Sequence, residues 1–185
     1  MTGRAVLAVI CLAAGLTSCG SGDGGGGGGG DTHPLGHTAV VEHADLNTDG
    51  NPKTKLGVTV EAVRKGSQAE LEAAGFTLDP DEKTATPYYV DVTFENQGPE
   101  DIDNALFVSM EDDDGGSISS TTIIDLGGEP FKECPKAERG TLKQGQTLES
   151  CKLFLVPAGR TPEKISFLPN DPEKPTDFVY WDATG

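Results

Sequence analysis

Basic residues are scarce in this sequence, and their scarcity limits the partners that the chain can have. Lysine and arginine together number 14, against 30 aspartates and glutamates, which gives a formal net charge of −16 at pH 7. A chain of this charge repels phosphate groups, so nucleic acid and anionic lipid headgroups are disfavoured as direct partners. We therefore expect no nucleic acid among its partners.

The sequence also lacks the short motifs by which many enzymes are recognised. GxSxG, HExxH, a phosphate-binding P-loop and a GxGxxG that follows a strand are all absent. Residues of a Ser-His-Asp triad need not be neighbours in sequence, so this absence alone does not exclude a triad. No pattern raises the case for one, and we expect the protein not to be an enzyme.

Long hydrophobic runs are absent as well, and the one apolar stretch begins after Arg4 and ends at Leu16. It is too short to span about 30 Å of hydrocarbon as a permanent helix, and it has the layout of an export signal. The tetrad Leu16-Thr17-Ser18-Cys19 resembles the lipobox cleaved by lipoprotein signal peptidase. The resemblance implies that residues 1–18 form a signal peptide and that Cys19 becomes the first mature residue, carrying diacylglycerol. The alternative is an ordinary secretory signal with a coincidental cysteine.

Of the four cysteines, two remain for folding, because Cys11 lies in the signal peptide and Cys19 would carry the lipid. In an exported domain the default for the remaining pair, Cys134 and Cys151, is a disulfide, which adds about 3 kcal/mol in the loop-entropy model. A reactive thiol pair or a metal site is the alternative, although the pair lacks CxxC spacing and a nearby histidine. Cys151 shares a strand face with Leu153, so we expect the disulfide to point into the core.

Glycine dominates the segment after Cys19, with seven consecutive glycines at positions 24–30. Such a run has no side chains to bury, so it cannot offset its backbone entropy. We interpret residues 19–36 as the lipidated cysteine with a flexible tether. Residues 37–185 then form one folded domain, long enough for a single sizeable core.

Alternation of apolar and polar residues with period two predicts an all-β domain. In the clearest case, residues 88–95, Val90, Val92 and Phe94 face the core and the residues between them, Tyr89 among them, face solvent. One short helix is predicted from Ser67 to Ala74, where a capping box begins. The eight predicted strands cover residues 38–43, 56–62, 88–95, 105–110, 118–126, 147–156, 164–168 and 177–182. Short strands with one small helix indicate an antiparallel β-sandwich.

Five stretches occur in a recognisable order: LGVTVEAV at 56–63, PYYVDVTFENQG at 87–98, MEDDDG at 110–115, LKQGQTL at 142–148 and LFLVP at 153–157. Together they resemble the immunoglobulin-like domains of small actinobacterial surface lipoproteins, a family that includes immunoprotective-antigen-like sandwiches. The resemblance implies an immunoglobulin-like antiparallel β-sandwich of about seven or eight strands. It implies no particular chemistry, because fold does not determine function.

The sharpest local motif is the first half of a calcium loop, D-x-[DN]-x-[DN]-G, which begins at Asp45. Side-chain oxygens at alternate positions of such a loop converge on one cation, so the candidate calcium ligands are Asp45, Asn47, Asp49 and Asn51. The twelfth position, where a bidentate glutamate belongs, is Leu56. The alternative is a solvated turn built from turn-favouring residues.

Three further groups have both a functional and a structural interpretation. The acidic stretch at residues 111–116 either holds a cation or forms a solvated turn. His33, His37 and His43 either contribute to a transition-metal site or are unrelated to one another. The aromatic residues Tyr88, Tyr89, Tyr180 and Trp181 either pack in the core or stack against a sugar or peptide. We expect the core for Trp181.

These patterns together predict an extracellular lipoprotein on the outer face of the cell membrane, acting as a non-catalytic binding module. Its membrane contact would be the lipid on Cys19, and its partner would be an unidentified protein or glycan. The alternative is a lipoprotein that binds a small ligand or calcium as an accessory in transport. An enzyme is a third interpretation, and no motif supports it.

Overall fold

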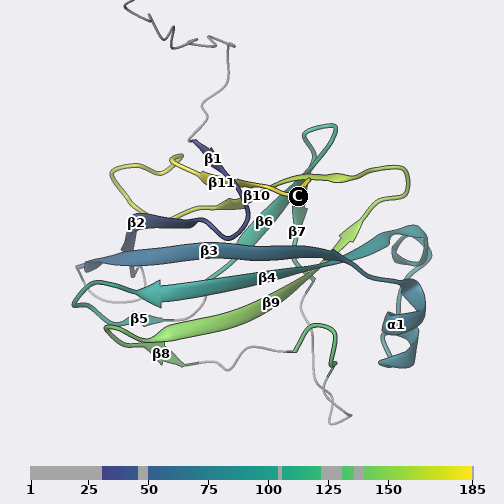
Figure 1. The fold of residues 1–185 in the computed structure, drawn as a ribbon, viewed down its shortest axis with the longest axis horizontal. Coiled ribbons are helices and arrows are strands. Elements are labelled where there is room, and N and C mark those ends of the chain that lie inside the picture. The colour runs from purple at the N-terminus through teal and green to yellow at the C-terminus, as the bar shows by residue number, and fades with distance from the viewer. Residues whose placement is uncertain (1–30, 46–49, 104–105, 122–130, 136–139, 185) are drawn as a thin grey trace, which may run out of the picture.

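The computed structural model describes residues 31–45, 50–103, 106–121, 131–135 and 140–184 (Figure 1). The predicted signal peptide, Cys19, the glycine run and the candidate calcium ligands Asn47 and Asp49 lie outside the described residues, so these predictions stay predictions. Within the described ranges, no helix is long and apolar enough to cross a membrane.

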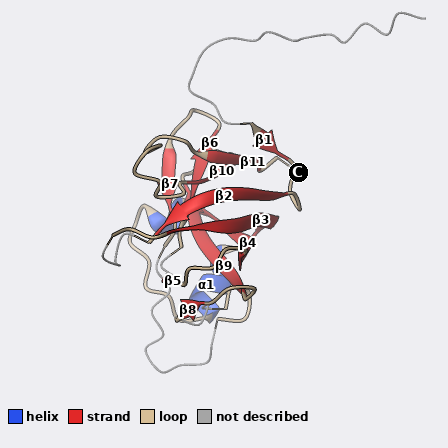
Figure 2. Cartoon of the chain, turned by 90° about the vertical axis from the view of Figure 1, so that its left-hand side faces the viewer, coloured by secondary structure: helices blue, strands red, loops and turns tan. Residues whose placement is uncertain are grey.

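Two sheets form the layers of a sandwich, as the views in Figures 1 and 2 show. The five-stranded sheet has the order β1 (Thr32–His33), β11 (Val179–Asp182), β10 (Pro162–Phe167), β6 (Val108–Asp112) and β7 (Ser117–Ser119). The four-stranded sheet has the order β2 (Thr38–Ala44), β3 (Lys53–Lys65), β4 (Thr86–Asn96) and β9 (Thr147–Val156). A short two-stranded sheet joins β5 (Ile102–Asp103) to β8 (Thr141–Leu142). The all-β sandwich is therefore confirmed.

The main core fills the space between the two large sheets. The alternation predicted for β4 is confirmed, because Val90, Val92 and Phe94 are at most 1% exposed. Trp181 is fully buried, as expected. Each such side chain stabilises the fold by about 1.5–3 kcal/mol through its burial. The largest side chains of this core are Trp181, Phe94, Phe154, Phe167, Leu56, Ile102, Met110 and Ile165.

A second, smaller core covers the outer face of the four-stranded sheet; we call it the outer cluster. Its buried members are Leu71, Leu78, Tyr89, Cys134 and Leu153. Two predictions are wrong here. Tyr89 was expected to face solvent but is 2% exposed, and Cys151 packs against the outer cluster instead of the main core. Both differences arise because a helix and a loop from elsewhere in the chain cover this face.

The helix that covers the outer cluster is α1 (Gln68–Ala73), and its capping box is confirmed. The main-chain N–H of Glu70 donates to Ser67 Oγ at 3.3 Å, and the N–H of Ser67 donates to Glu70 Oε2 at 2.7 Å. Leu71 is the buried residue of this helix. A single turn, η1 (Glu82–Thr84), follows and leads into β4. The cap fixes the start of α1 at Ser67, and with this start Leu71 packs against the sheet.

The folded domain begins earlier than the predicted boundary at His37. Thr32 and His33 form β1, which pairs in parallel with Tyr180 and Trp181 of β11. The main-chain N–H of Gly36 also donates to the carbonyl of Val60 at 2.8 Å. The last residues of the predicted tether are therefore part of the sandwich. A strand of two residues carries too little pattern to be recognised in a sequence.

Strand bounds also differ from the predicted ones in β3 and β7. β3 extends over Lys53–Lys65, and its register with β4 shifts between Val60 and Ala62, which marks a β-bulge. The predicted strand at 118–126 appears as β7, which ends at Ser119, and residues 122–126 lie outside the described residues. The bulge matters for function because it decides which face the residues after it occupy.

Candidate functional site

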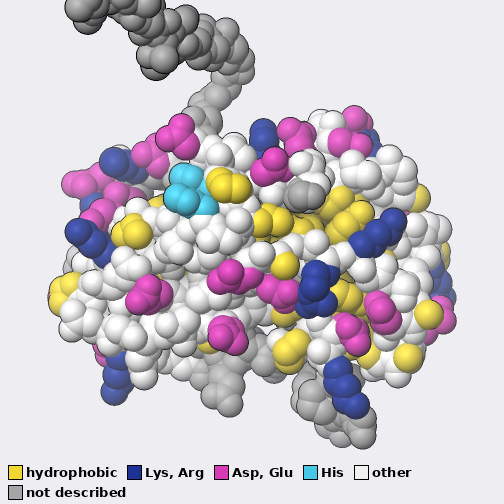
Figure 3. Space-filling model, in the orientation of Figure 1, with side chains coloured by type: hydrophobic (Ala, Val, Ile, Leu, Met, Phe, Trp, Pro, Cys, Tyr) yellow, Lys and Arg dark blue, Asp and Glu magenta, His cyan; other side chains and the backbone are white. Residues whose placement is uncertain are grey.

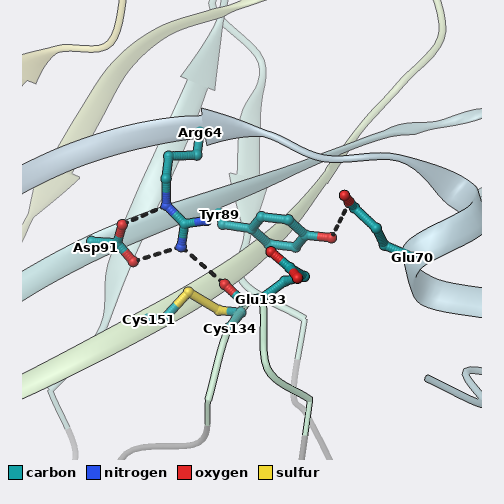
Figure 4. The surroundings of a disulfide bond; sticks show 7 residues. All are labelled: Arg64, Glu70, Tyr89, Asp91, Glu133, Cys134 and Cys151. Carbon is teal, nitrogen blue, oxygen red and sulfur yellow. Dashed lines mark hydrogen bonds and ion pairs between the residues drawn. A yellow bond between two sulfur atoms is a disulfide. The ribbon is translucent and has the colours of Figure 1, made fainter. Parts of the chain in front are cut away.

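A group of hydrogen-bonded polar side chains surrounds the disulfide on the outer face of the four-stranded sheet. Cys134 and Cys151 are joined by a disulfide, with their Cα atoms 5.2 Å apart (Figure 4). This confirms the predicted pair. Cys151 belongs to β9 and Cys134 to the described segment 131–135, so the bond fastens that segment onto the sheet.

Arg64 lies at the centre of this arrangement. Its Nε and Nη2 donate to the two carboxylate oxygens of Asp91 at 2.7 and 3.0 Å, and Nη2 also donates to the carbonyl of Glu133 at 2.9 Å (Figure 4). The guanidinium carbon lies 5.4 Å from the centre of the Tyr89 ring. The hydrogen bond to Asp91 raises the pKa of Arg64. Arg64 therefore joins the sheet to residues 131–135, which we call the disulfide segment.

The bulge in β3 explains why Arg64 can do this. With strict alternation, Arg64 would share the inward face of Val60. The register shift between Val60 and Ala62 reverses the faces, so that Val63 packs against the main core and Arg64 reaches Asp91 on the outside. The sequence shows a period-two run through this region and gives no sign of the bulge.

Tyr89 connects the same group to α1. Its hydroxyl donates to Glu70 Oε2 at 3.1 Å. Burial raises the pKa of Tyr89 far above its usual value, and the hydrogen bond to Glu70 adds to the effect. The backbone N–H of Ser67 lowers the pKa of the Glu70 carboxyl. Tyr89 thus keeps its proton and Glu70 its charge, and their hydrogen bond holds α1 against the sheet.

The predicted calcium loop is only partly within the described residues. Its base is closed by the main-chain N–H of Asp45, which donates to the carbonyl of Pro52 at 3.1 Å. Gly50 and Asn51 both have positive φ, at 84° and 47°, which is the left-handed backbone that glycine and asparagine tolerate. Within the described residues, no group of three or more potential ligands from His, Cys, Asp and Glu comes together. Calcium binding stays a prediction.

The acidic stretch at residues 111–116 forms a hydrogen-bonded turn. Asp112 is 5% exposed, and its Oδ1 accepts the N–H groups of Asp114 and Gly116 at 3.1 and 2.7 Å. Asp113 Oδ2 accepts a hydrogen bond of 3.0 Å from the hydroxyl of Thr161. The hydrogen bond from the backbone N–H of Thr161 lowers the pKa of the Asp113 carboxyl. The structural interpretation accounts for these carboxylates, because they hold the turn and its neighbour in place.

The three histidines are divided between two environments. His33 and His37 stack with ring centres 4.4 Å apart, because the residues between them turn the chain back. His43 is 4% exposed in β2, with its ring against Phe167 and its Nδ1 without a partner among the described residues. The contact between His33 and His37 is not predictable from their spacing, because residues four apart lie side by side on a helix and these two are not in one.

The outer face of the five-stranded sheet differs from the covered one. Its outward residues in the strands include Ser109, Glu111, Lys164 and Tyr180, all half-buried. Lys164 Nζ lies 5.9 Å from the centre of the Tyr180 ring. The ring of Phe178, two residues earlier and just before β11, has its centre 6.1 Å from that of Tyr180. Burial raises the pKa of Tyr180, so its hydroxyl stays protonated. Acidic side chains with basic ones between them are spread over the side of the molecule shown in Figure 3. The outer face of this sheet is the candidate binding surface.

Comparison with known proteins identifies the fold and nothing finer. No family model matches the chain, and no curated protein sequence matches it. MPT63, a secreted protein from Mycobacterium tuberculosis, is similar in structure, with a TM-score of 0.52 and 14% identity over 82% of this chain and 96% of MPT63. The YjhA protein from Bacillus subtilis covers 82% of this chain and 100% of its own, with a TM-score of 0.49 and 18% identity. The likeness shows an immunoglobulin-like β-sandwich.

Proposed function

We propose that the protein is a lipoprotein anchored to the outer face of the cell membrane, where its β-sandwich serves as a non-catalytic binding module. The observation that carries the extracellular part is the Cys134–Cys151 disulfide, because such bonds persist in oxidising compartments outside the cytosol. The secreted nature of MPT63, the similar structure, supports the same location. The Leu16-Thr17-Ser18-Cys19 tetrad supports lipid attachment at Cys19.

The shape of the domain supports binding as the mode of action. One sheet face is closed by α1 and the disulfide segment, and the Arg64 and Tyr89 contacts hold this cover in place. A scaffold clamped on one side can present the other side in a fixed geometry, which lowers the entropy lost on binding. The outer face of the five-stranded sheet is the surface so presented.

The anchoring half of the proposal is tested by comparing Cys19→Ala with Cys11→Ala in a bacterium that processes lipoproteins. Cys11 lies in the same signal segment and is the matched control. We expect wild type and Cys11→Ala to incorporate a clickable fatty acid and to partition into the detergent phase of Triton X-114. Cys19→Ala should do neither. Equal labelling of both variants would refute anchoring at Cys19.

The binding half is tested with a photo-crosslinking amino acid placed on the outer face of the five-stranded sheet in living cells. The same amino acid at Thr93, on the outer face of the other sheet, provides the control position. A product specific to the first position supports a binding module. Turnover of a substrate that a single point substitution abolishes would overturn the non-catalytic assignment.

A further inference from the structure

One row of residues across the five-stranded sheet consists entirely of hydroxyl side chains. The strand registers place Thr32 opposite Tyr180, Tyr180 opposite Ser166, Ser166 opposite Ser109 and Ser109 opposite Ser119. Each of the five strands contributes one member. Since neighbouring strands lie about 4.8 Å apart, the row is roughly 19 Å long. We call it the hydroxyl row.

The hydroxyl row points away from the main core. The adjacent register row contains Trp181, Ile165 and Met110, which are fully buried, and successive residues of a strand point to opposite faces. Within the described part of the chain, the hydroxyl groups of Thr32, Tyr180, Ser109 and Ser119 bind no other residue. These groups therefore retain their full capacity to donate and accept hydrogen bonds.

The surroundings of the row combine aromatic rings with balanced charge. Phe178 and Tyr180 place two rings at one end, in contact at 6.1 Å. The next outward row is charged: Lys164 pairs in register with Asp182 on one side and with Glu111 on the other. Ser166, at the middle of the hydroxyl row, is only 3% exposed, so the hydroxyl groups open to a ligand are those of the other four members, two on each side of it.

We propose that the hydroxyl row binds a neutral oligosaccharide laid across the strands. This proposal deepens the proposed function, on which it rests, by naming the class of the partner. A sugar hydroxyl donates one hydrogen bond and accepts others, as serine, threonine and tyrosine hydroxyls do, so a line of them pairs with a sugar chain without leaving unmatched groups. The apolar face of a sugar ring packs on the rings of Phe178 and Tyr180.

Charge and location favour a neutral glycan over the other classes of partner. The chain carries a net charge of −16, which repels anionic polymers, and the nearest basic residue, Lys164, already lies between two acidic residues. The row also begins at β1, where the described chain begins. The residues from Cys19 to Asp31 span at most about 40 Å when extended, so a lipid on Cys19 would hold this surface close to the cell envelope.

The test uses the full-length protein in detergent and a panel of neutral hexasaccharides, namely β-1,4-linked glucose, α-1,4-linked glucose and α-1,6-linked mannose, with hyaluronan hexasaccharide as the anionic comparison. Binding is measured by isothermal titration calorimetry. Ser109→Val with Ser119→Val removes two hydroxyl groups and keeps residues that favour strands. Thr93→Val, on the outer face of the other sheet, is the matched control. Tyr180→Phe removes a hydroxyl and keeps the ring, which guards against a variant that fails to fold.

We expect wild type and Thr93→Val to bind a neutral hexasaccharide with equal affinity, and hyaluronan not to bind. The serine double variant should lose at least about fivefold in affinity, since each of the two lost hydrogen bonds weakens binding by about twofold to tenfold. Failure of all neutral hexasaccharides to bind at millimolar concentration, or binding that the double variant leaves intact, overturns the proposal. Capture of a protein by a photo-crosslinker at Ser119 overturns sugar binding and leaves the binding-module function standing. If no hexasaccharide binds and the photo-crosslinker captures nothing, sugar binding and the binding-module function are both overturned.

Discussion

The indole N–H of Trp181 donates a hydrogen bond of 2.9 Å to the main-chain carbonyl of His37. Trp181 lies in the last strand of the sandwich, and His37 lies just after the first, so this bond connects the two ends of the domain across the chain. The ring of His33 also lies 6.0 Å from that of Trp181. The N-terminal edge of the sandwich therefore depends on the tryptophan.

Trp181→Phe should lower the free energy of unfolding by about 2–4 kcal/mol. The smaller ring leaves a cavity in the core, and the His37 carbonyl loses its donor. Urea unfolding followed by circular dichroism measures the loss. Tyr180→Phe, in the neighbouring position and only half-buried, should change stability by less than about 0.5 kcal/mol. Equal effects of the two substitutions would contradict this account of the edge.

Replacing Cys134 and Cys151 together by serine should destabilise the domain by about 3 kcal/mol and lower its Tm by several degrees. The bond closes a loop with a sequence separation of 17 and holds the segment that covers the outer cluster. Differential scanning calorimetry of the wild type and the double variant measures the shift. Two free thiols found by alkylating the native, non-reduced protein would contradict the bond itself.

Gly66→Ala should be destabilising, by about 1–3 kcal/mol, because a Cβ there would lie 2.6 Å from atoms of the Tyr89 ring. The ring is fixed by Glu70 and Arg64, so it has little room to move. Gly140→Ala is the matched control, since nothing lies within 4 Å of its added Cβ and its φ is not positive. A Gly66→Ala protein as stable as Gly140→Ala would show that the outer cluster is looser than its contacts indicate.

Stability should fall as the pH drops from about 7 to about 5, because of His43. Burial lowers the pKa of His43, against the opposing effects of the Pro169 carbonyl and the Asp45 charge. A folded-state pKa below the unfolded value means that the unfolded chain takes up the proton first, so acid favours unfolding in this range and the dependence levels off above about pH 7.5.

The measurement is the urea midpoint at several pH values for wild type and His43→Phe. The loss between about pH 7 and 5 should be smaller in His43→Phe than in wild type. The double variant His33→Asn with His37→Asn keeps the buried histidine and should keep the loss that His43 causes. An unchanged pH profile in His43→Phe would rule out this residue as the source.

Calcium should bind the loop at residues 45–51 weakly, with a Kd of about 10⁻⁴–10⁻³ M, the range of extracellular modules that lack a full set of carboxylates. Asp45→Asn with Asp49→Asn should abolish the heat seen in millimolar calorimetric titrations. Asp101→Asn with Asp103→Asn, both exposed at β5, removes the same two charges elsewhere and provides the control. If calcium gives neither heat nor a thermal shift with the wild type, the loop is a turn and nothing more.

The sequence predicts the layers of this fold better than their outer surfaces. The β4 pattern identifies Val90, Val92 and Phe94 as core, because burial between two sheets imposes a strict alternation. The same pattern misplaces Tyr89, since its cover comes from α1 and from the disulfide segment, both distant in sequence. Which outward residues are covered depends on contacts that no local pattern encodes.

The candidate surface was hidden for a related reason. The members of the hydroxyl row, such as Thr32 and Ser109, come from five separate parts of the chain. Only the strand order and register align them, and a slip of one residue in any strand would turn its hydroxyl toward the core. The bulge that turns Arg64 outward is equally invisible, because it is one extra residue within an unbroken strand pattern. The disulfide was predictable, since the pair follows from counting cysteines.

The parallel pairing of β1 with β11 sets the order in which this protein can be completed. Thr32 and His33 leave the ribosome among the earliest residues of the domain, yet their sheet partners, Tyr180 and Trp181, are among the last. Contacts separated by so much of the chain form late, because a long loop must close first. The edge next to the proposed anchor is therefore synthesised first and assembled last.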